Sequence, residues 1–492
     1  MKVGFVQLLG VWPPHTAVDL ELAEEHARNG DAVHLFACRG NLLSCDTNID
    51  HDRRECRRCM ARRARAWSVA TARPDTTPFP VLTRAEKRKL LALPYSFANS
   101  AELRNYKFET FDAGEAALSS IVSRYRNPFP DMAFDRNLVR RTLVSCVGVY
   151  LALRREIRTR GIDRMYVFNG RFANLRAALR ACQAEGVDCH VHDRGFDRHH
   201  YSVFKNRMLS EIDPYRDDIL RAWHAAPADV RETTAARFYE LRRRGVIPNW
   251  RSFIDGQRAD TLPPGWNPDR RNVAVYITAE DEFVANGEDW INGIYPQGQA
   301  AAIARIGKDL QAREPSMHLW VRIHPGLKGV ENAFIRDMLR LHGGNISVIP
   351  ADSEVDSYRL LEACEKALTF GSTIGIEAVY WGKPSVLAGP CYYRDLGGCV
   401  VPKTHEGVVE AVRATLPAPE RLAALQFGYH EASVGEPYKV YQATTPFEGV
   451  YRGLDLGGPL SSEGFACEGV APGLQRYWML KAKLGLTGRL KW

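Results

Sequence analysis

The alternation of short apolar runs with amphipathic stretches between residues 273 and 387 constrains the fold more than any other feature. The apolar runs read as strands at Val273–Ile277, Leu319–Ile323, Ile346–Ile349, Ala367–Phe370 and Ser385–Leu387. The stretches between them carry helical periodicity. This pattern is typical of a parallel sheet covered by helices. Ligands of such sheets bind at the carboxyl ends of the strands, so we expect the loops after the first four strands to face one site.

The first half of the chain begins with the same alternation. Val3–Gln7 and Val33–Ala37 read as strands, and Asp19–Asn29 between them reads as a helix that ends at a glycine. We therefore predict an α/β protein with two Rossmann-like, doubly wound domains that face a cleft. The predicted parts are an N-terminal Rossmann-like domain (1–245) with a cysteine-containing insertion (about 38–110), a proline-rich linker (246–270), a C-terminal Rossmann-like domain (271–440), and a partly helical, basic tail (441–492).

The composition excludes several classes of protein. The chain has 492 residues, 45% of them hydrophobic and 25% charged, which excludes global disorder. No run approaches the roughly 20 apolar residues of a membrane span; the apolar stretch Leu143–Leu153 is short and flanked by arginines. The amino terminus lacks the features of a signal peptide, so we expect a cytoplasmic protein. A net charge of +8 favours acidic partners such as nucleotides and does not by itself indicate nucleic acid binding, which we do not expect.

One loop of the second domain carries Arg322, His324 and Pro325 at the end of a predicted strand. Proline restricts the backbone beside the histidine. Arg322 lies two residues earlier in an extended segment, so both side chains share a face. Together they suit a phosphate, through charge-assisted hydrogen bonds. The alternative is a strand end whose histidine caps a neighbouring carbonyl.

A second loop has Gly371 at the turn after a strand, followed by Ser372 and Thr373 at the start of a helix. Hydroxyls and backbone N–H groups at a helix start bind anions. Glu377 lies one turn further along, where a carboxylate suits a ribose diol. The alternative is an ordinary capped helix.

Taken together, R-x-H-P and the later G-S-T-x-G-x-E-A resemble the motifs of bacterial capsule-polysaccharide and lipopolysaccharide glycosyltransferases of the GT-B fold. This group includes transferases that use CMP-activated Kdo or sialic acid. The resemblance is strongest over about residues 270–400. It implies that His324 and Pro325, with Ser372 and Thr373, bind the donor phosphate, and that Glu377 binds the ribose. It extends more weakly to Phe168–Arg171, which resembles an N-G-R turn of capsule-synthesis proteins and makes Arg171 an acceptor-binding candidate.

The general base is less clear from the sequence. The family's acid-Asp-Gly motif has no clear copy, and His192-Asp193-Arg194-Gly195 is the nearest segment. The candidates are Asp193, His15 and Asp19; a surface loop histidine is the alternative reading of His15. Glu280 and Glu282 follow the first strand of the second domain and suit acceptor hydroxyls or a divalent metal, with a solvated acidic loop as the alternative. By the family resemblance, the chemical step requires no metal or other cofactor.

Four cysteines gather within a short stretch of the insertion, at Cys38, Cys45, Cys56 and Cys59. Four thiolates with a C-x-x-C pair suit a tetrahedral structural zinc, and the surrounding arginines favour the thiolate form. An iron–sulfur cluster uses the same number of ligands. Four unrelated reduced cysteines are the alternative.

The end of the chain, Gln475–Trp492, is basic and contains tryptophans and leucines. Such a segment suits an anionic membrane surface at the inner face of the membrane, or a helix that packs back on the first domain. The combined hypothesis is a glycosyltransferase that moves a sugar from a nucleotide sugar, with a CMP-linked acidic sugar favoured over a UDP-sugar, to a polysaccharide, lipid-linked glycan or protein acceptor. The alternatives are a UDP-sugar epimerase of the same fold and a non-catalytic scaffold of a polysaccharide assembly system.

Overall fold

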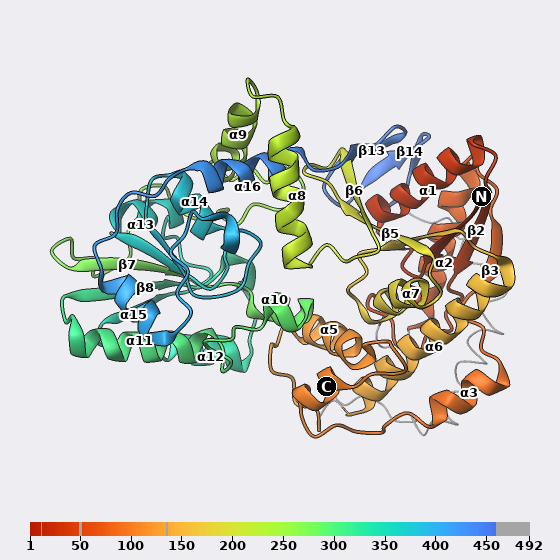
Figure 1. The fold of residues 1–492 in the computed structure, drawn as a ribbon, viewed down its shortest axis with the longest axis horizontal. Helices are drawn as coiled ribbons and strands as arrows, with labels where there is room; N and C mark the ends of the chain where they lie inside the picture. Colours follow the sequence, from red (N-terminus) through yellow and green to blue (C-terminus); the bar gives the residue numbers. More distant parts are fainter. Residues whose placement is uncertain (11, 49–51, 134–135, 459–492) are drawn as a thin grey trace. The chain divides into compact units, whose positions relative to one another are not determined.

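The computed structural model describes residues 1–10, 12–48, 52–133 and 136–458 (Figure 1). The chain divides into two compact units. Unit 1 comprises Met1–Tyr125, Phe129–Leu209 and the segment from Gly435 onward, and unit 2 comprises Arg126–Pro128 and Ser210–Val434. Each unit is built on its own sheet, so the prediction of two α/β domains is confirmed.

Unit 1 has a seven-stranded sheet of order β12-β6-β5-β4-β1-β2-β3. Its strands are β1 Lys2–Gln7, β2 Ala32–Ala37, β3 Asp75–Pro78, β4 Arg164–Phe168, β5 Asp188–Arg194, β6 His200–Lys205 and β12 Glu436–Pro437. The strands from β5 to β3 run parallel, whereas β6 and β12 are antiparallel to their neighbours. A small antiparallel sheet follows, with β13 Tyr441–Ala443, β14 Gly449–Tyr451 and β15 Leu454–Asp455.

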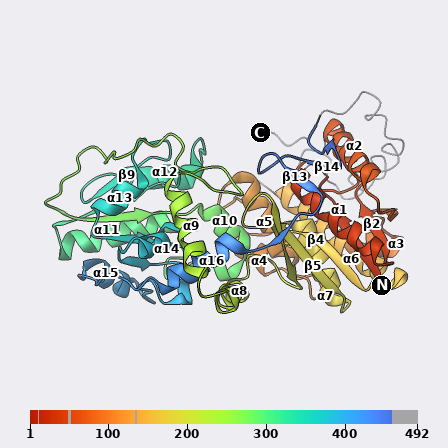
Figure 2. The ribbon, with the colours of Figure 1, turned by 90° about the horizontal axis from the view of Figure 1, so that it is seen from above.

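Helices cover both faces of the unit 1 sheet (Figure 2). Helices α1 (Pro13–Arg28) and α2 (Arg53–Val69) pack together on one face. Helices α5 (Ala113–Tyr125), α6 (Arg136–Arg160) and α7 (Ala173–Ala184) pack together on the other, and the shorter α3 (Arg84–Leu91) and α4 (Ser100–Asn105) lie beside them. The apolar run Leu143–Leu153 is buried inside α6. No helix in the described part of the chain is long and apolar enough to cross a membrane.

Unit 2 has five parallel strands in the order β11-β10-β7-β8-β9. They are β7 Arg271–Tyr276, β8 Met317–Arg322, β9 Ile346–Ile349, β10 Lys366–Thr369 and β11 Ser385–Leu387. The side chains of β7 alternate between two separate apolar cores, with Val273 and Val275 on one face and Ala274 and Tyr276 on the other. The strand is therefore buried on both faces, which is why it reads as a continuous apolar run.

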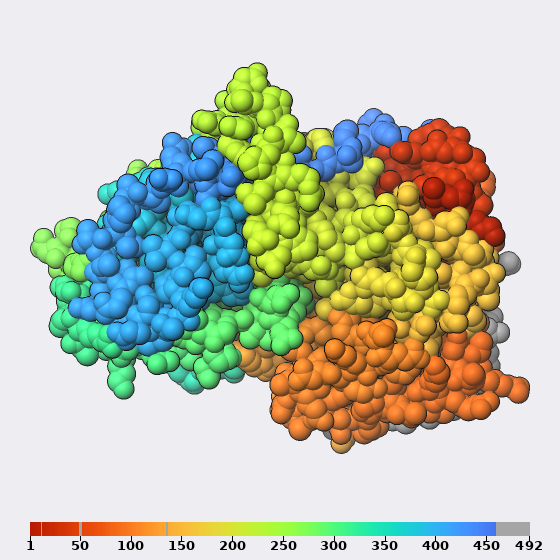
Figure 3. All heavy atoms as spheres, in the orientation of Figure 1, coloured from red at the N-terminus to blue at the C-terminus, as the bar shows by residue number. Residues whose placement is uncertain are grey.

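The helices of unit 2 are α8 Ile212–Ala225, α9 Arg231–Arg243, α10 Glu280–Asn286, α11 Gln299–Arg313, α12 Ala333–Leu339, α13 Ser357–Ala363, α14 Ile374–Tyr380, α15 His405–Arg413 and α16 Leu422–Ser433. Helices α8 and α9 pack on α16, and Tyr239 of α9 stacks on Tyr380 of α14 with ring centroids 4.1 Å apart. The tip where α8 meets α9 projects from the surface in yellow-green (Figure 3).

The domain boundaries differ from those expected. We placed residues up to 245 in the N-terminal domain, but α8 and α9 group with unit 2, and the chain returns to unit 1 at Gly435. The proline-rich segment 246–270 contains no helix or strand and lies wholly within unit 2, where Trp266 stacks on Trp320 at 5.4 Å. In the predicted insertion, β3 extends the sheet and α2 runs for 17 residues. We did not predict strand β3, because its sequence, Asp-Thr-Thr-Pro, has no alternation of apolar and polar residues.

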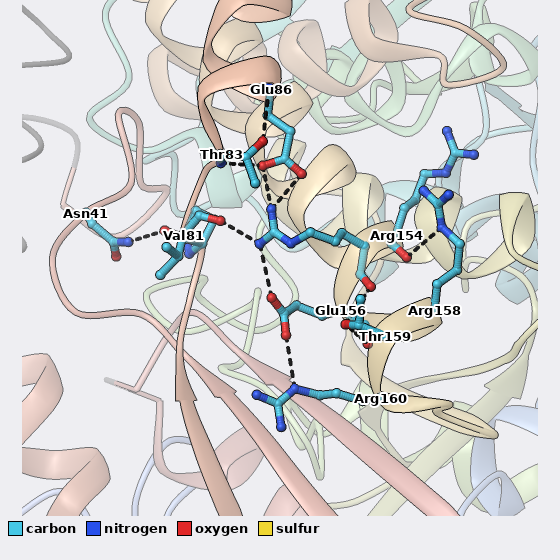
Figure 4. Close-up of polar contacts among 11 residues, drawn as sticks. Asn41, Val81, Thr83, Glu86, Arg154, Glu156, Arg158, Thr159 and Arg160 are labelled. Atoms are coloured by element: carbon cyan, nitrogen blue, oxygen red, sulfur yellow. Dashed lines mark hydrogen bonds and ion pairs between the residues drawn. The ribbon is translucent and has the colours of Figure 1, made fainter.

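A polar network fixes α3 to the end of α6 in unit 1 (Figure 4). Thr83 and Glu86 form a reciprocal cap at the start of α3, with bonds of 3.2 and 2.7 Å between side chains and backbone N–H groups. Arg155 donates to both carboxylate oxygens of Glu86 at 2.6 and 2.5 Å and to Glu156 at 3.0 Å. Glu86 therefore serves a helix cap and an ion pair at once.

We expect Glu86→Ala to lower the free energy of unfolding by about 1–2 kcal/mol, because it removes a cap and leaves Arg155 without its bidentate partner. Urea denaturation measures this. Lys87→Ala, at an exposed position of the same helix, is the matched control and should change stability by less than about 0.5 kcal/mol. Equal losses in the two variants would contradict the role given to Glu86.

Candidate functional site

The sheet of unit 2 brings three of the predicted loops to neighbouring positions. Strand β7 lies between β10 and β8, so the loops after these three strands leave the same edge of the sheet side by side. The chain runs from β7 outward through β8 and β9 on one side, and β10 and β11 lie on the other. The boundary between β7 and β10 is therefore the topological switch point, where open α/β sheets bind ligands.

His324 lies directly after β8, half-buried, as the cap of a short turn. Its Nδ1 accepts the backbone N–H of Gly326 at 3.0 Å, which leaves the proton of the neutral ring on Nε2. Burial, with a smaller contribution from the nearby Arg242, Arg126 and Arg322, lowers the pKa of His324 to about 4. The side chain is therefore a neutral N–H donor near pH 7, and does not supply the positive charge that we expected it to bring to a phosphate.

Arg322 is almost fully buried, with 2% of its surface exposed. Its guanidinium donates to the carbonyl oxygens of Pro350 and, at 3.1 Å, Ser353. Burial lowers its pKa to about 10. The structure thus places this predicted phosphate ligand against the loop after β9, which it holds to β8.

The loop after β10 has the tight turn that its sequence predicts. Gly371 has φ +123°, and a Cβ there would lie 2.4 Å from the Pro390 carbonyl oxygen, so glycine is required. Helix α14 begins at Ile374 with Thr373 in the capping position, but neither hydroxyl caps the helix. The Thr373 hydroxyl accepts a hydrogen bond from Arg242 at 2.9 Å. The Ser372 side chain is half-buried, and its carbonyl accepts from the Tyr393 hydroxyl.

Glu377 is the centre of a buried polar group, with 1% of its surface exposed. One carboxylate oxygen accepts from Arg242 Nε at 3.0 Å, and the other accepts from the Tyr358 hydroxyl at 2.5 Å. Arg242 therefore joins the two predicted donor-site residues, Thr373 and Glu377. Sequence reasoning missed Arg242 because its helix was assigned to the other domain. The run of three arginines at the end of that helix was the available signal.

The three acidic residues that follow β7 lie in three different environments. Glu280 is buried and caps α11 through the Gln299 N–H, at 3.2 and 3.3 Å. Burial raises its pKa to about 7. Asp281 is also buried and accepts from Arg126 at 2.5 Å. Glu282 is exposed, 3.6 Å from Arg126. Of the two acceptor ligands predicted in this loop, Glu280 and Glu282, only Glu282 is exposed.

Unit 1 has its own switch point, between β1 and β4, and three predicted residues lie there. His15 lies in the first turn of α1, and its ring packs on Phe168 of β4 with centroids 3.7 Å apart. Asp19, one turn later, accepts from Gln7 at 3.0 Å and lies 3.1 Å from His192 Nε2. His15 is a buried helix residue and not the surface loop histidine of the alternative reading. Burial lowers its pKa well below the usual value, and His192 and Arg194 lower it further.

Asp193 follows His192 on β5 and is also buried. Its carboxylate accepts from Asn169 Nδ2 at 2.8 Å and from the Arg194 backbone N–H at 2.8 Å. Asn169 belongs to the N-G-R turn after β4, where it adopts φ +59°. Arg171 of the same turn donates to Ser123 at 2.9 Å. The structure thus brings Asp193 and the N-G-R turn together, as neither motif alone indicated.

The four predicted zinc ligands also converge in unit 1. Cys38 follows β2, Cys45 lies in the next loop, and Cys56 and Cys59 lie on α2. All four line one cavity. Within the residues that the structure describes, no three His, Cys, Asp or Glu side chains already stand at the spacing of bound metal ligands. The predicted membrane-binding segment Gln475–Trp492 lies outside the described residues.

The fold and these loops define a two-unit α/β protein with mainly parallel sheets and with polar side chains gathered at both switch points. Residues 290–406 match the model of a family described as "Capsule polysaccharide biosynthesis protein". This segment includes His324 and the loop from Gly371 to Glu377, so the predicted resemblance to capsule-synthesis proteins is confirmed there. A search of curated proteins gave no significant match.

Solved structures give distant similarities. The chain is 15% identical to the β-Kdo 2,4-transferase KpsC of Thermosulfurimonas dismutans, with a TM-score of 0.36, covering 56% of this chain and 88% of that chain. It is 12% identical to a UDP-GlcNAc 2-epimerase of Neisseria meningitidis, with a TM-score of 0.26, covering 91% and 96%. Similarities of this size do not define the activity of the chain.

Proposed function

We propose that the protein is a glycosyltransferase of capsule polysaccharide synthesis that uses a nucleotide-sugar donor. The observation that carries the proposal is the position of His324, in the loop after β8, and of Thr373 and Glu377, at the start of α14. All three lie at one sheet edge of unit 2, within the segment that matches the capsule-synthesis family. Arg242 ties Thr373 to Glu377 and supplies the positive charge that His324 lacks.

In this proposal, the Nε2–H of His324 donates a hydrogen bond to the leaving phosphate, and Thr373 and the backbone after Gly371 hold the same group. Preorganised donors of this kind stabilise charge that develops in the transition state. Glu377 holds the ribose through lone pairs that Arg242 and Tyr358 leave free. Because only 1% of Glu377 is exposed, the side chains that cover it must move to admit the sugar. The motif resemblance favours a CMP-linked acidic sugar over a UDP-sugar as the donor.

The proposed acceptor is a polysaccharide, a lipid-linked glycan or a protein, with Arg171 of unit 1 as a candidate ligand. We also propose that the protein acts on the cytoplasmic side of the membrane, at its inner face. The basic segment Gln475–Trp492 supports this through its attraction to anionic lipids.

We expect CMP, tested beside UDP, GDP and ADP, to raise the melting temperature of the purified protein. A ligand at 100 times its Kd stabilises a folded protein by about 2.7 kcal/mol. Arg242→Ala should weaken the shift, and Arg340→Ala, at an exposed position of unit 2, should leave it intact. Stabilisation by UDP alone would overturn the CMP preference. No stabilisation by any nucleotide would favour the scaffold alternative.

Product analysis with a CMP-linked acidic sugar and with UDP-sugars separates transfer from epimerisation. A transferase should give at most slow donor hydrolysis without an acceptor and a new glycosidic linkage with one. Conversion of a UDP-sugar to its epimer without any acceptor would overturn the proposed function.

A further inference from the structure

One cavity in unit 1, lined by four cysteines and called the cysteine cavity below, has no role in the proposed function. Its wall includes Cys38, Cys45, Cys56 and Cys59, together with the apolar side chains of Leu8, Leu42 and Met60. The four sulfurs come from three different places: the end of β2, the following loop, and one face of α2. The fold therefore brings together four thiols that lie within a segment of 22 residues, from Cys38 to Cys59.

Polar groups of unit 1 already donate to three of these sulfurs. The backbone N–H of Gly10 lies 3.2 Å from Cys59 Sγ, and the backbone N–H of Gly40 lies 3.3 Å from Cys38 Sγ. The Asn48 side-chain amide lies 3.1 Å from Cys56 Sγ. Neutral thiols are weak acceptors, whereas metal-bound thiolates carry negative charge and are oriented by donors of this kind.

A buried positive charge lies beside the same cavity. Arg63 of α2 is 7% exposed, and its guanidinium donates only to carbonyl oxygens, those of Gln7 at 3.4 Å and Cys38 at 2.5 Å. No carboxylate in the described part of the chain forms an ion pair with it. A buried arginine without an anionic partner is costly. A centre of four thiolates around a divalent ion has a net charge of −2 and would supply that partner.

We propose that Cys38, Cys45, Cys56 and Cys59 together bind one zinc ion in a tetrahedral, structural site. The four thiols release four protons as the four Zn–S bonds form, with no change of oxidation state. Because no three of the side chains yet stand at ligand spacing, binding requires thiol rotations into the cavity that all four line.

The site goes beyond the proposed glycosyl transfer and ties three segments of unit 1 together. It links α2 to the end of β2 and, through the Gly10 N–H, to the loop between β1 and α1. That loop leads directly to His15 at the unit 1 switch point. Loss of the ion should therefore loosen the loop without removing any residue from the donor loops of unit 2.

The test is the metal content of the purified full-length protein, measured by mass spectrometry for zinc and iron and by assay of acid-labile sulfide. We expect one zinc ion per chain, and replacement by Co²⁺ should give the intense visible absorption of tetrahedral cobalt thiolate. Cys56→Ser and Cys59→Ser should each lose most of the metal. Cys399→Ser, in unit 2 and away from the cavity, should retain it.

The measurement on the unaltered protein does not depend on how well any variant folds. Protein without zinc, in which all 11 cysteines react with a thiol reagent after denaturation and no Co²⁺ spectrum develops on reconstitution, would overturn the proposal. Iron with stoichiometric sulfide would overturn it in favour of an iron–sulfur cluster. Zinc that survives both Cys56→Ser and Cys59→Ser would place the metal elsewhere.

Discussion

Replacing His324 with alanine is expected to lower the rate of sugar transfer by about 10²–10³-fold, the usual cost of removing one preorganised donor to a developing anion. The expectation follows from the fixed ring: Nδ1 accepts the Gly326 N–H, so Nε2 carries the only proton available to a phosphate. The measurement is single-turnover transfer at saturating donor, which separates the chemical step from binding.

A matched variant sharpens this test. His324→Gln keeps an N–H donor of similar reach, so it should be more active than His324→Ala. If the role of His324 were purely structural, the glutamine variant would not be the more active of the two. Binding of the nucleotide alone should weaken less than transfer, because the hydrogen bond is strongest in the transition state. Full activity of His324→Ala would show that the residue has no part in the reaction.

The pH dependence gives an independent check on His324. Its pKa is lowered to about 4, mainly by burial, so the ring stays neutral and the rate should not titrate with a histidine between pH 6 and 8. The unfolded chain has the ordinary value near 6.5 and binds more protons than the folded chain between about pH 4 and 6.5. The stability contribution is therefore complete above pH 6.5 and is lost as the pH falls toward 4. Between pH 7 and 5, the unaltered protein should lose more stability than His324→Gln.

The parallel core of unit 2 was predictable because its strands are buried on both faces. Val273 and Ala274 belong to different cores, yet both are apolar, so the run stands out from its polar flanks. The edge strand β3 and the antiparallel β6 carry polar residues and give no such signal. A local pattern fails where a strand has neither a continuous apolar run nor a strict alternation of apolar and polar residues.

The sequence predicted the local conformation of the site loops, but not which groups their side chains contact. The turn at Gly371 and the cap at His324 follow from neighbouring residues. Which group each side chain contacts depends on segments far away in the sequence. Arg322 turns out to bind carbonyls of the β9 loop, and Arg242, 131 positions before Thr373, reaches its hydroxyl. Sequence spacing alone does not contain such contacts.

Asp193→Asn is expected to lower sugar transfer by about 10²–10⁴-fold, the range in which general acid–base groups contribute. Asp193 is the candidate base that the structure joins to the N-G-R turn, through Asn169 at 2.8 Å. The change keeps the shape of the side chain and removes the charge that accepts a proton. Nucleotide binding should persist, because the donor loops belong to unit 2.

His15→Gln is the comparison that distinguishes the two candidate bases. Burial holds the pKa of His15 well below its usual value, with His192 and Arg194 lowering it further, so its ring is a poor proton acceptor near pH 7. A general base whose pKa lies far below the working pH accepts a proton weakly and accelerates the reaction little. We therefore expect His15→Gln to lower the rate of sugar transfer by less than about tenfold. If His15→Gln abolishes transfer while Asp193→Asn retains it, the base is His15, and its pKa must rise when the acceptor binds.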